Sequence, residues 1–427
     1  MLEAVAAIFI IGYLCIVFEH VVHINKTASA LLTGIGCWAA MTLLEVPTDL
    51  VPNGTDWKEW INQALRHHLA QISEILFFLL GAMTIVEVID SHHGFRKITS
   101  LVKTTHPVKI LWILSLLTFF LSAVLDNLTT SIVMVSVLRK LIHDQKRRIY
   151  FASLLVIAAN AGGAWSPIGD VTTTMLWVGG QITTGAIVSR LFLPSLVNML
   201  VPLVVVSWLM RKETVQISAM AGEKERVAGD TFILFLGLGG LVFVPVFKSI
   251  THLPPYLGIL LVLGMVWAST EWLHRSKPVE SKSLYTPAHA LAKIDTPSIL
   301  FFLGILLAVG SLETLGILEV MANRLASTIG NENLIVGIIG LASAVVDNVP
   351  LVAASMAMYS LDTFPQDHSF WLFLAYAAGT GGSIFIIGSA AGVAVMGMEK
   401  IDFMWYMIKI SWLALLGYLA GCALYLL

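Results

Sequence analysis

The sequence predicts an all-α polytopic membrane protein built from two inverted repeats, each with a re-entrant hairpin and a broken transmembrane helix. Three observations lead to this prediction. The 427 residues are 57% hydrophobic and only 12% charged, whereas soluble proteins carry about 25% charged residues. Long apolar segments recur along the chain. Two unusual motifs occur twice, in the same order, in the two halves of the sequence.

Several apolar segments have the length of a membrane-spanning helix, for which about 20 residues are needed. We expect complete spans at 4–23, 28–46, 71–90, 189–210, 230–250, 256–274, 297–318 and 403–426. The first of them follows Glu3, where a signal peptide would carry basic residues, so we expect it to be retained. The protein is therefore expected to be surrounded by membrane lipid.

Two other apolar segments, 110–142 and 334–361, are interrupted at the centre by an Asp-Asn pair. The pairs are Asp126-Asn127 and Asp347-Asn348. Each flanking arm is expected to be too short to cross the bilayer alone. We therefore predict two re-entrant hairpins with an aspartate at each tip.

Segments 150–180 and 370–398 are long enough to cross, but each contains a glycine-rich stretch midway. These stretches run from Asn160 to Asp170 and from Gly379 to Ser389. Gly and Pro disfavour a continuous helix, and non-helical backbone survives at membrane depth only where protein or a water-filled cavity satisfies it. The two breaks are therefore candidate binding positions.

The duplicated motifs divide the chain into a first repeat at 1–210, a cytoplasmic linker at 211–229 and a second repeat at 230–427. Basic residues flank the hairpin 110–142, whereas acidic residues follow the hairpin 334–361. Because cytoplasmic loops collect Lys and Arg, the first hairpin is expected to open from the cytoplasm and the second from outside. Both termini then lie outside. Inverted repeats with broken helices are typical of secondary transporters.

The hairpin aspartates are the first candidates for an ion site, because an isolated charge at the bilayer centre costs about 2.5–3.5 kcal/mol on insertion scales. Amide, hydroxyl and backbone oxygens near the tips would complete an oxygen cage, which suits a hard cation. The alternative is that each aspartate caps the second arm of its hairpin. The proposed ligands are Asp126, Asn127, Thr129, Thr130, Asp347 and Asn348.

Asp170 is a third candidate, on a segment that also contains Asn160, Thr172 and Thr173. Its repeat partner is Ser389, so the site is expected to be asymmetric. A further carboxylate would raise the proton affinity of its neighbours, and cation and proton would compete for the same oxygens. Capping of the following half-helix is again the alternative.

Glu74 and Asp295 are weaker candidates, and each is either part of a proton relay or a partner in a structural contact. His67 is a possible pH sensor. No metal-ligand spacing is present, since His20 and His23 are three residues apart and Cys15, Cys37 and Cys422 form no pattern. We expect no cofactor. A net charge of −2 gives no cationic surface for nucleic acid.

The motifs Leu125-Asp126-Asn127-Leu128-Thr129-Thr130, Asn160-Ala-Gly-Gly163, Pro167-Ile-Gly-Asp170, Val346-Asp347-Asn348 and Ile387-Gly388-Ser389 resemble those of NhaD-type sodium/proton antiporters. These belong to the ion transporter superfamily, together with arsenite, citrate and dicarboxylate carriers. The resemblance implies Na⁺ or Li⁺ exchange for H⁺, a homodimer, elevator-type alternating access and a bacterial inner membrane. It adds Ser343 to the site residues above.

The expected function is therefore Na⁺/H⁺ antiport, with Na⁺ bound at Asp126, Asp347 and Asp170. The closest alternative is a Na⁺-coupled carrier of a small oxyanion or carboxylate, which the aspartates and the lack of a cationic side chain near the breaks disfavour. An ion channel with the hairpins as pore loops is a further alternative. An intramembrane enzyme is disfavoured because no nucleophile-base pair lies at membrane depth.

Overall fold

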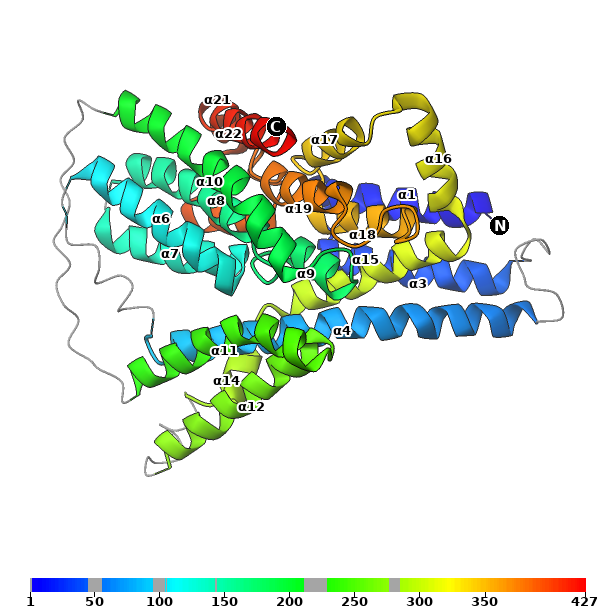
Figure 1. Cartoon of the computed structure of the whole chain (residues 1–427), viewed down its shortest axis with the longest axis horizontal. Coiled ribbons are helices and arrows are strands. Elements are labelled where there is room, and N and C mark those ends of the chain that lie inside the picture. The colour runs from blue at the N-terminus through cyan, green and yellow to red at the C-terminus, as the bar shows by residue number, and fades with distance from the viewer. Residues whose placement is uncertain are drawn as a thin grey trace.

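The structure is a computed structural model that describes residues 2–44, 56–94, 104, 106–142, 144–210, 229–275 and 285–427. This part of the chain is all-helical and contains no β-strand (Figure 1). The first-half helices are α1 (Leu2–Val17), α2 (Glu19–Val22), α3 (Lys26–Leu43), α4 (Trp57–Ser91), α6 (Pro107–Leu125), α7 (Asn127–Leu141), α8 (Gln145–Ala164), α9 (Val171–Val178) and α10 (Thr184–Leu209).

The second half begins with two long helices and ends with a series of shorter ones. They are α11 (Asp230–Thr251), α12 (Pro255–Leu273), α14 (Pro287–Lys293), α15 (Thr296–Thr314), α16 (Ile317–Ile329), α17 (Glu332–Ala342), α18 (Asn348–Met358), α19 (Ser369–Gly381), α20 (Ala390–Glu399), α21 (Phe403–Lys409) and α22 (Ser411–Leu426). The predicted linker 211–229 lies outside the described residues except for Gly229.

Six helices of the described part, α4, α6, α10, α11, α12 and α15, are long and apolar enough to cross a membrane. Two bent pairs, α16 with α17 and α21 with α22, raise the number to as many as eight. The multi-pass prediction is thus confirmed. Helix α4 has 35 residues and begins at Trp57, so the expected loop 47–70 is helical over its second part.

The first Asp-Asn segment differs from its prediction in one respect. Helix α6 begins at Pro107 and has 19 residues, which corresponds to about 28 Å at 1.5 Å per residue. It is long enough to cross alone, so the prediction that each arm is too short is wrong for α6. Helices α6 and α7 pack against each other and meet at Asp126. A re-entrant course for this pair stays a prediction.

Both glycine-rich segments are broken within the predicted stretches, 160–170 and 379–389. Helix α8 continues through Gly162 and Gly163 to Ala164, and the chain leaves the helix at 165–170. A Cβ at Gly162 would clash with the carbonyl of Phe119 on α6, and a Cβ at Gly381 would clash with the carbonyl of Gly340 on α17. The glycines therefore permit close helix crossings, and the breaks follow them.

The same packing contacts occur in both halves. The Ser122 hydroxyl donates to the Ala159 carbonyl at 2.6 Å, and the Ser343 hydroxyl donates to the Ala378 carbonyl at 3.1 Å. Asp170 and Ser389 have matching backbone angles, with φ/ψ of −145°/149° and −141°/151°, and each caps the half-helix that follows. This recurrence supports the repeat, whereas its inversion in the membrane stays a prediction.

The helices form two groups. We call α1, α3, α4, α11, α12, α14 and α15 the flanking group, because they pack mainly on one another. The central group comprises α6 to α10 and α17 to α22, with both Asp-Asn motifs and both broken helices. In Figure 1 the helices α4, α11 and α12 lie along the lower side, whereas α6, α7, α8 and α10 lie together at the upper left.

Two polar contacts join the halves within the central group. At the end of α20, the buried carboxylate of Glu399 binds the Nε atoms of Arg139 and Arg148, each at 2.6 Å. At the start of α10, Thr183 donates its backbone N–H and its hydroxyl to the carboxylate of Asp367 at 2.6 and 2.8 Å. Each contact fixes the end of one broken helix to the other repeat.

Candidate functional site

The central cavity lies where α6 meets α7 and where α8 is separated from α9. Its polar lining consists of Asp126, Asn127, Asp170, Thr174 and Ser298. Apolar side chains of the flanking helices, among them Phe78, Leu241 and Phe302, form the rest of the wall. The cavity therefore lies between the two helix groups.

Asp126 caps helix α7 and has a strained backbone. Its carboxylate accepts hydrogen bonds from the backbone N–H of Thr129 at 2.8 Å and from the Thr129 hydroxyl at 2.7 Å. Its φ/ψ of 98°/156° lies in a region that is populated almost only by glycine, at a cost of about 1–3 kcal/mol for other residues. Strain of this kind is concentrated at functional sites.

Asp170 caps helix α9 in a similar way, and it is 2% exposed. One carboxylate oxygen accepts from the backbone N–H and the hydroxyl of Thr172, both at 2.9 Å. The other accepts from the Asn127 amide at 2.6 Å. Capping was the alternative to ion binding at both aspartates, and the structure shows that both do cap.

A buried amide network extends from Asp170 into the second repeat. The Asn127 amide also donates to Oδ1 of Asn160 at 3.0 Å. The Asn160 amide in turn donates to the hydroxyls of Ser383 and Ser389, each at 2.9 Å. Oxygens from both broken helices are therefore held in fixed positions beside the two carboxylates.

Neither carboxylate of the central cavity forms an ion pair with a basic side chain of the described residues. In the described part of the chain, the ion pairs involve Asp144, Asp347, Glu87 and Glu399 as the acids, and neither Asp126 nor Asp170. Two such carboxylates in a low-dielectric region require a bound cation or a proton. Carboxylate, amide and hydroxyl oxygens are the ligands that hard cations prefer.

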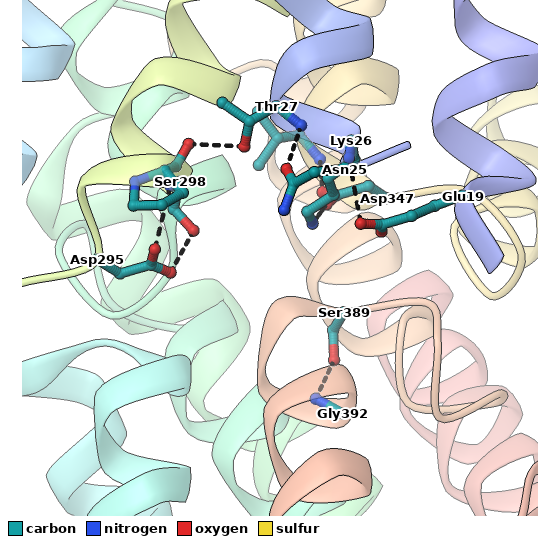
Figure 2. A network of polar contacts seen from close by, with 11 residues as sticks. Glu19, Asn25, Lys26, Thr27, Asp295, Ser298, Asp347, Ser389 and Gly392 are labelled. Atoms are coloured by element: carbon teal, nitrogen blue, oxygen red, sulfur yellow. Dashed lines mark hydrogen bonds and ion pairs between the residues drawn. The ribbon is translucent and has the colours of Figure 1, made fainter. Parts of the chain in front are cut away.

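Asp347 lies at a second cavity, which we call the Lys26 cavity and which is lined by Tyr13, Glu19, Lys26, Asp347 and Pro350 among others. Its carboxylate accepts from the backbone N–H of Val349 at 3.2 Å, and so caps α18. The ammonium of Lys26 lies 3.1 Å from its other oxygen (Figure 2). The prediction that no cationic side chain lies near the breaks is wrong for the second break, because Ile387 of that break lines the same cavity as Lys26.

Lys26 is the residue that sequence reasoning missed. It is the first residue of α3, and a lysine is unfavourable there because the helix N-terminus carries partial positive charge. That mismatch is the one local signal that a carboxylate from elsewhere pairs with it. Its partner is 321 residues away in the sequence, which no local pattern specifies.

The remaining candidates from the hairpins and broken helices are buried near the aspartates described above. The Thr173 hydroxyl donates to the backbone carbonyl of Asp170 at 2.9 Å. The Thr130 hydroxyl is buried and has no hydrogen-bond partner among the described residues. Asn348 is 4% exposed and Ser343 is fully buried. The structure thus places the predicted site residues in and around the central cavity and the Lys26 cavity.

Of the three weaker candidates, Glu74 and His67 line neither cavity, whereas Asp295 is hydrogen-bonded to Ser298 of the central cavity. Glu74 is in the middle of α4, and His67 is exposed on the same helix. Its neighbour His68 is buried, with Nε2 3.0 Å from the Thr314 hydroxyl. Asp295 is exposed and caps α15 through Ser298. This cap is a structural contact of Asp295, and its role in a proton relay stays a prediction.

The three aspartates do not form one cluster. Within the described residues, no three His, Cys, Asp or Glu side chains are grouped so that they could hold one metal ion. Asp126 and Asp170 share the central cavity, and Asp347 belongs to the Lys26 cavity.

Comparison with known proteins connects this architecture to a family. The family model described as "Citrate transporter" (CitMHS) matches residues 13–379. The chain is 50% identical to Sodium/proton antiporter 1 of Arabidopsis thaliana, over 99% of this chain and 72% of that protein. It is 47% identical to Sodium/proton antiporter 2 of the same plant, over 99% and 98%.

A bacterial relative is similar over the same extent. The Na(+)/H(+) antiporter NhaD of Alkalimonas amylolytica is 32% identical over 98% of this chain and 89% of that protein. The chain is an NhaD-type transporter of the citrate transporter family. As an NhaD-type transporter, it is a multi-pass membrane protein whose relatives occur in a plant and in bacteria.

Proposed function

We propose that this NhaD-type transporter exchanges Na⁺ for H⁺ across its membrane. The observation that carries the proposal is the central cavity, in which Asp126 and Asp170 have no fixed cationic partner among the described residues. The names of the relatives, which are sodium/proton antiporters, support the same conclusion.

In this proposal Na⁺ is bound by the carboxylates of Asp126 and Asp170, with the oxygens of the Asn127–Asn160 network as further ligands. Protonation of the same carboxylates would release the ion, because a neutral carboxyl no longer attracts it. Cation and proton thus exclude each other at one site. Li⁺ shares the preference for hard oxygen ligands, so we propose that it is transported too.

Na⁺-coupled transport of a carboxylate is the second candidate, and two observations favour it. The matching family is described as citrate transporters, and Lys26 provides a cation beside one of the Asp-Asn motifs. However, Asp347 already neutralises Lys26, and the central cavity adds two acids and no base from the described residues. An anionic substrate would meet a net negative site, so we favour cation exchange.

The two helix groups support an elevator-type mechanism, in which the central group would move against the flanking group. Both broken helices and both Asp-Asn motifs lie in the central group and would move as one body. We further propose that the exposed apolar faces of the flanking group carry the homodimer contact. The bacterial inner membrane and the outward-facing termini stay predictions.

The test is transport in proteoliposomes with an imposed pH gradient, followed on addition of Na⁺, Li⁺, K⁺ or citrate. We expect Na⁺ and Li⁺ to dissipate the gradient. Asp126→Asn and Asp170→Asn should each lower the Na⁺-dependent rate about 10- to 100-fold, because each replaces a charge-assisted contact worth about 1.5–3 kcal/mol. Asparagine retains the helix cap.

Asp144→Asn is the matched control, because Asp144 also caps a helix, α8, but lies outside both cavities. Its rate should equal that of the wild type. Citrate uptake that requires Na⁺, with no dissipation of the pH gradient by any cation alone, would contradict cation exchange and favour the Na⁺-coupled carboxylate carrier.

A further inference from the structure

The second Asp-Asn motif carries a feature that the proposed function does not use. The ammonium of Lys26 lies 3.1 Å from Asp347, within the Lys26 cavity. The side chains are only 25% and 14% exposed. Figure 2 shows this pair beside Glu19, whose carboxylate accepts the backbone N–H of Lys26 at 3.1 Å. The charges of Asp347, Glu19 and Asp295 all act on the Lys26 ammonium.

The ammonium occupies the place at Asp347 that a transported cation would take. Lysine presents a compact single positive charge, so it neutralises this carboxylate as Na⁺ would. Asp126 and Asp170 have no such partner in the described part of the chain. In this conformation, therefore, the Asp126 carboxylate is free to bind a cation, whereas the Asp347 carboxylate is paired with Lys26.

The two members of the pair come from different helix groups. Lys26 begins α3 of the flanking group, which is held to α15 by the close crossing at Gly34 and Gly304 and by the hydrogen bond from Trp38 Nε1 to the Leu307 carbonyl at 2.8 Å. Asp347 precedes α18 of the central group. Any displacement between the groups changes the distance between ammonium and carboxylate.

We propose that Lys26 is an intramolecular competitor of the transported cation at Asp347. The ion pair holds the conformation described here, and a cation binds Asp347 only after the ammonium has left it. Glu19 is the neighbouring acid that can receive the displaced ammonium. The inference rests on the proposed function, because it takes Na⁺ to be the transported ion.

The first test measures equilibrium Na⁺ binding to purified protein in detergent at about pH 9, where free carboxyls are ionised. Lys26→Met retains the length of the side chain and removes its charge. We expect its apparent Kd for Na⁺ to fall about fivefold, since a partly exposed ion pair no longer competes. The gain should disappear in Lys26→Met/Asp347→Asn. Lys293→Met, which breaks the Glu87 pair, should bind like the wild type.

An unchanged or weaker affinity of Lys26→Met would overturn the proposal, as would a gain that persists in the double variant. A wild-type protein that binds no Na⁺ would instead refute the proposed function.

A second measurement uses the wild-type chain, so it is independent of how well a variant folds. Amine acylation followed by mass spectrometry reports the accessibility of Lys26. Na⁺ should increase the labelling of Lys26 at least about twofold relative to choline at equal ionic strength, while Lys293 stays unchanged. Equal labelling of Lys26 in both salts would contradict competition.

Discussion

The two Asp-Asn motifs have the same sequence and nearly the same place in the repeat, yet their aspartates are held differently. Asp126 has a strained backbone, with φ at 98°, and no basic partner in the described residues. Asp347 has an ordinary φ of −49° and a lysine partner. Both cap a half-helix. Both repeats therefore place an aspartate as a helix cap. Contacts with other parts of the chain determine which of the two carboxylates is free to bind a cation.

The neighbouring half-helices show the same asymmetry. Asp170 and Ser389 have matching backbone angles and both act as caps, but only Asp170 brings a charge. The carboxylate and the hydroxyl are connected through Asn127 and Asn160. Repeated backbone geometry with different side chains therefore concentrates negative charge on one side of a near-symmetric centre.

The largest expected effect concerns the contact that fixes the arm of the Asp126 motif. Helix α7 begins beside Asp126 and carries Arg139, which binds the buried Glu399. Glu399→Ala leaves Arg139 and Arg148 without this partner, and the loss costs about 1.5–3 kcal/mol because both guanidinium groups stay partly exposed. We expect a correspondingly lower stability in thermal unfolding in detergent.

The matched control is Glu319→Ala, because Glu319 is exposed on α16, and it should unfold like the wild type. Glu399→Gln retains the shape of the side chain and can still accept hydrogen bonds, so it should lie between the two. Equal stability of Glu399→Ala and Glu319→Ala would show that the Glu399 contact does not hold α7.

A smaller effect separates the two carboxylates in transport. Asp170→Asn should lower the Na⁺-dependent rate in proteoliposomes about 10- to 100-fold, whereas Asp347→Asn should lower it only about threefold. The second loss has a different cause, because the variant removes the Asp347 carboxylate that pairs with Lys26. Adding Lys26→Met to Asp347→Asn should therefore recover part of the rate. Equal losses for the two single variants would remove the distinction between the motifs.

Features that rest on local chemistry were predicted well from the sequence. Asp126, Asp170 and Asp347 were recognised because charged residues in apolar segments need compensation. The duplicated Asp-Asn and Gly-Gly motifs correctly indicated matching local structure, as the Ser122 and Ser343 hydrogen bonds show. The family resemblance rested on these motifs and is confirmed by the relatives.

Features that depend on distant contacts were not predicted. The glycine-rich stretches predicted the two helix breaks, but the close backbone crossings at Gly162 and Gly381 were not foreseen. The start of α4 at Trp57 was missed because its first turns are polar and resemble a loop. The pairing of Lys26 with Asp347 depends on how two helix groups meet, and hydropathy carries no information on that.

The smallest effect has opposite signs at the two motifs. Asp126→Gly relieves backbone strain of about 1–3 kcal/mol, loses a few tenths of a kcal/mol in capping and costs about 0.5–1 kcal/mol in chain entropy. We expect the variant to unfold at the same or a higher temperature than the wild type. Asp347→Gly has no strain to relieve and loses the lysine pair, worth at most about 1 kcal/mol, so it should unfold at a lower temperature.

Thermal unfolding in detergent measures both shifts, and the two asparagine variants are the controls, since they remove the charge without changing the intrinsic backbone freedom much. Asp126→Asn should lack the gain of Asp126→Gly, because asparagine does not relieve the strain at φ 98°. A lower unfolding temperature for Asp126→Gly than for Asp126→Asn would show that the Asp126 backbone stores no strain. The two motifs would then differ only in the pairing of Asp347 with Lys26. The ability of Asp126 to bind a cation would depend only on its lack of a basic partner among the described residues.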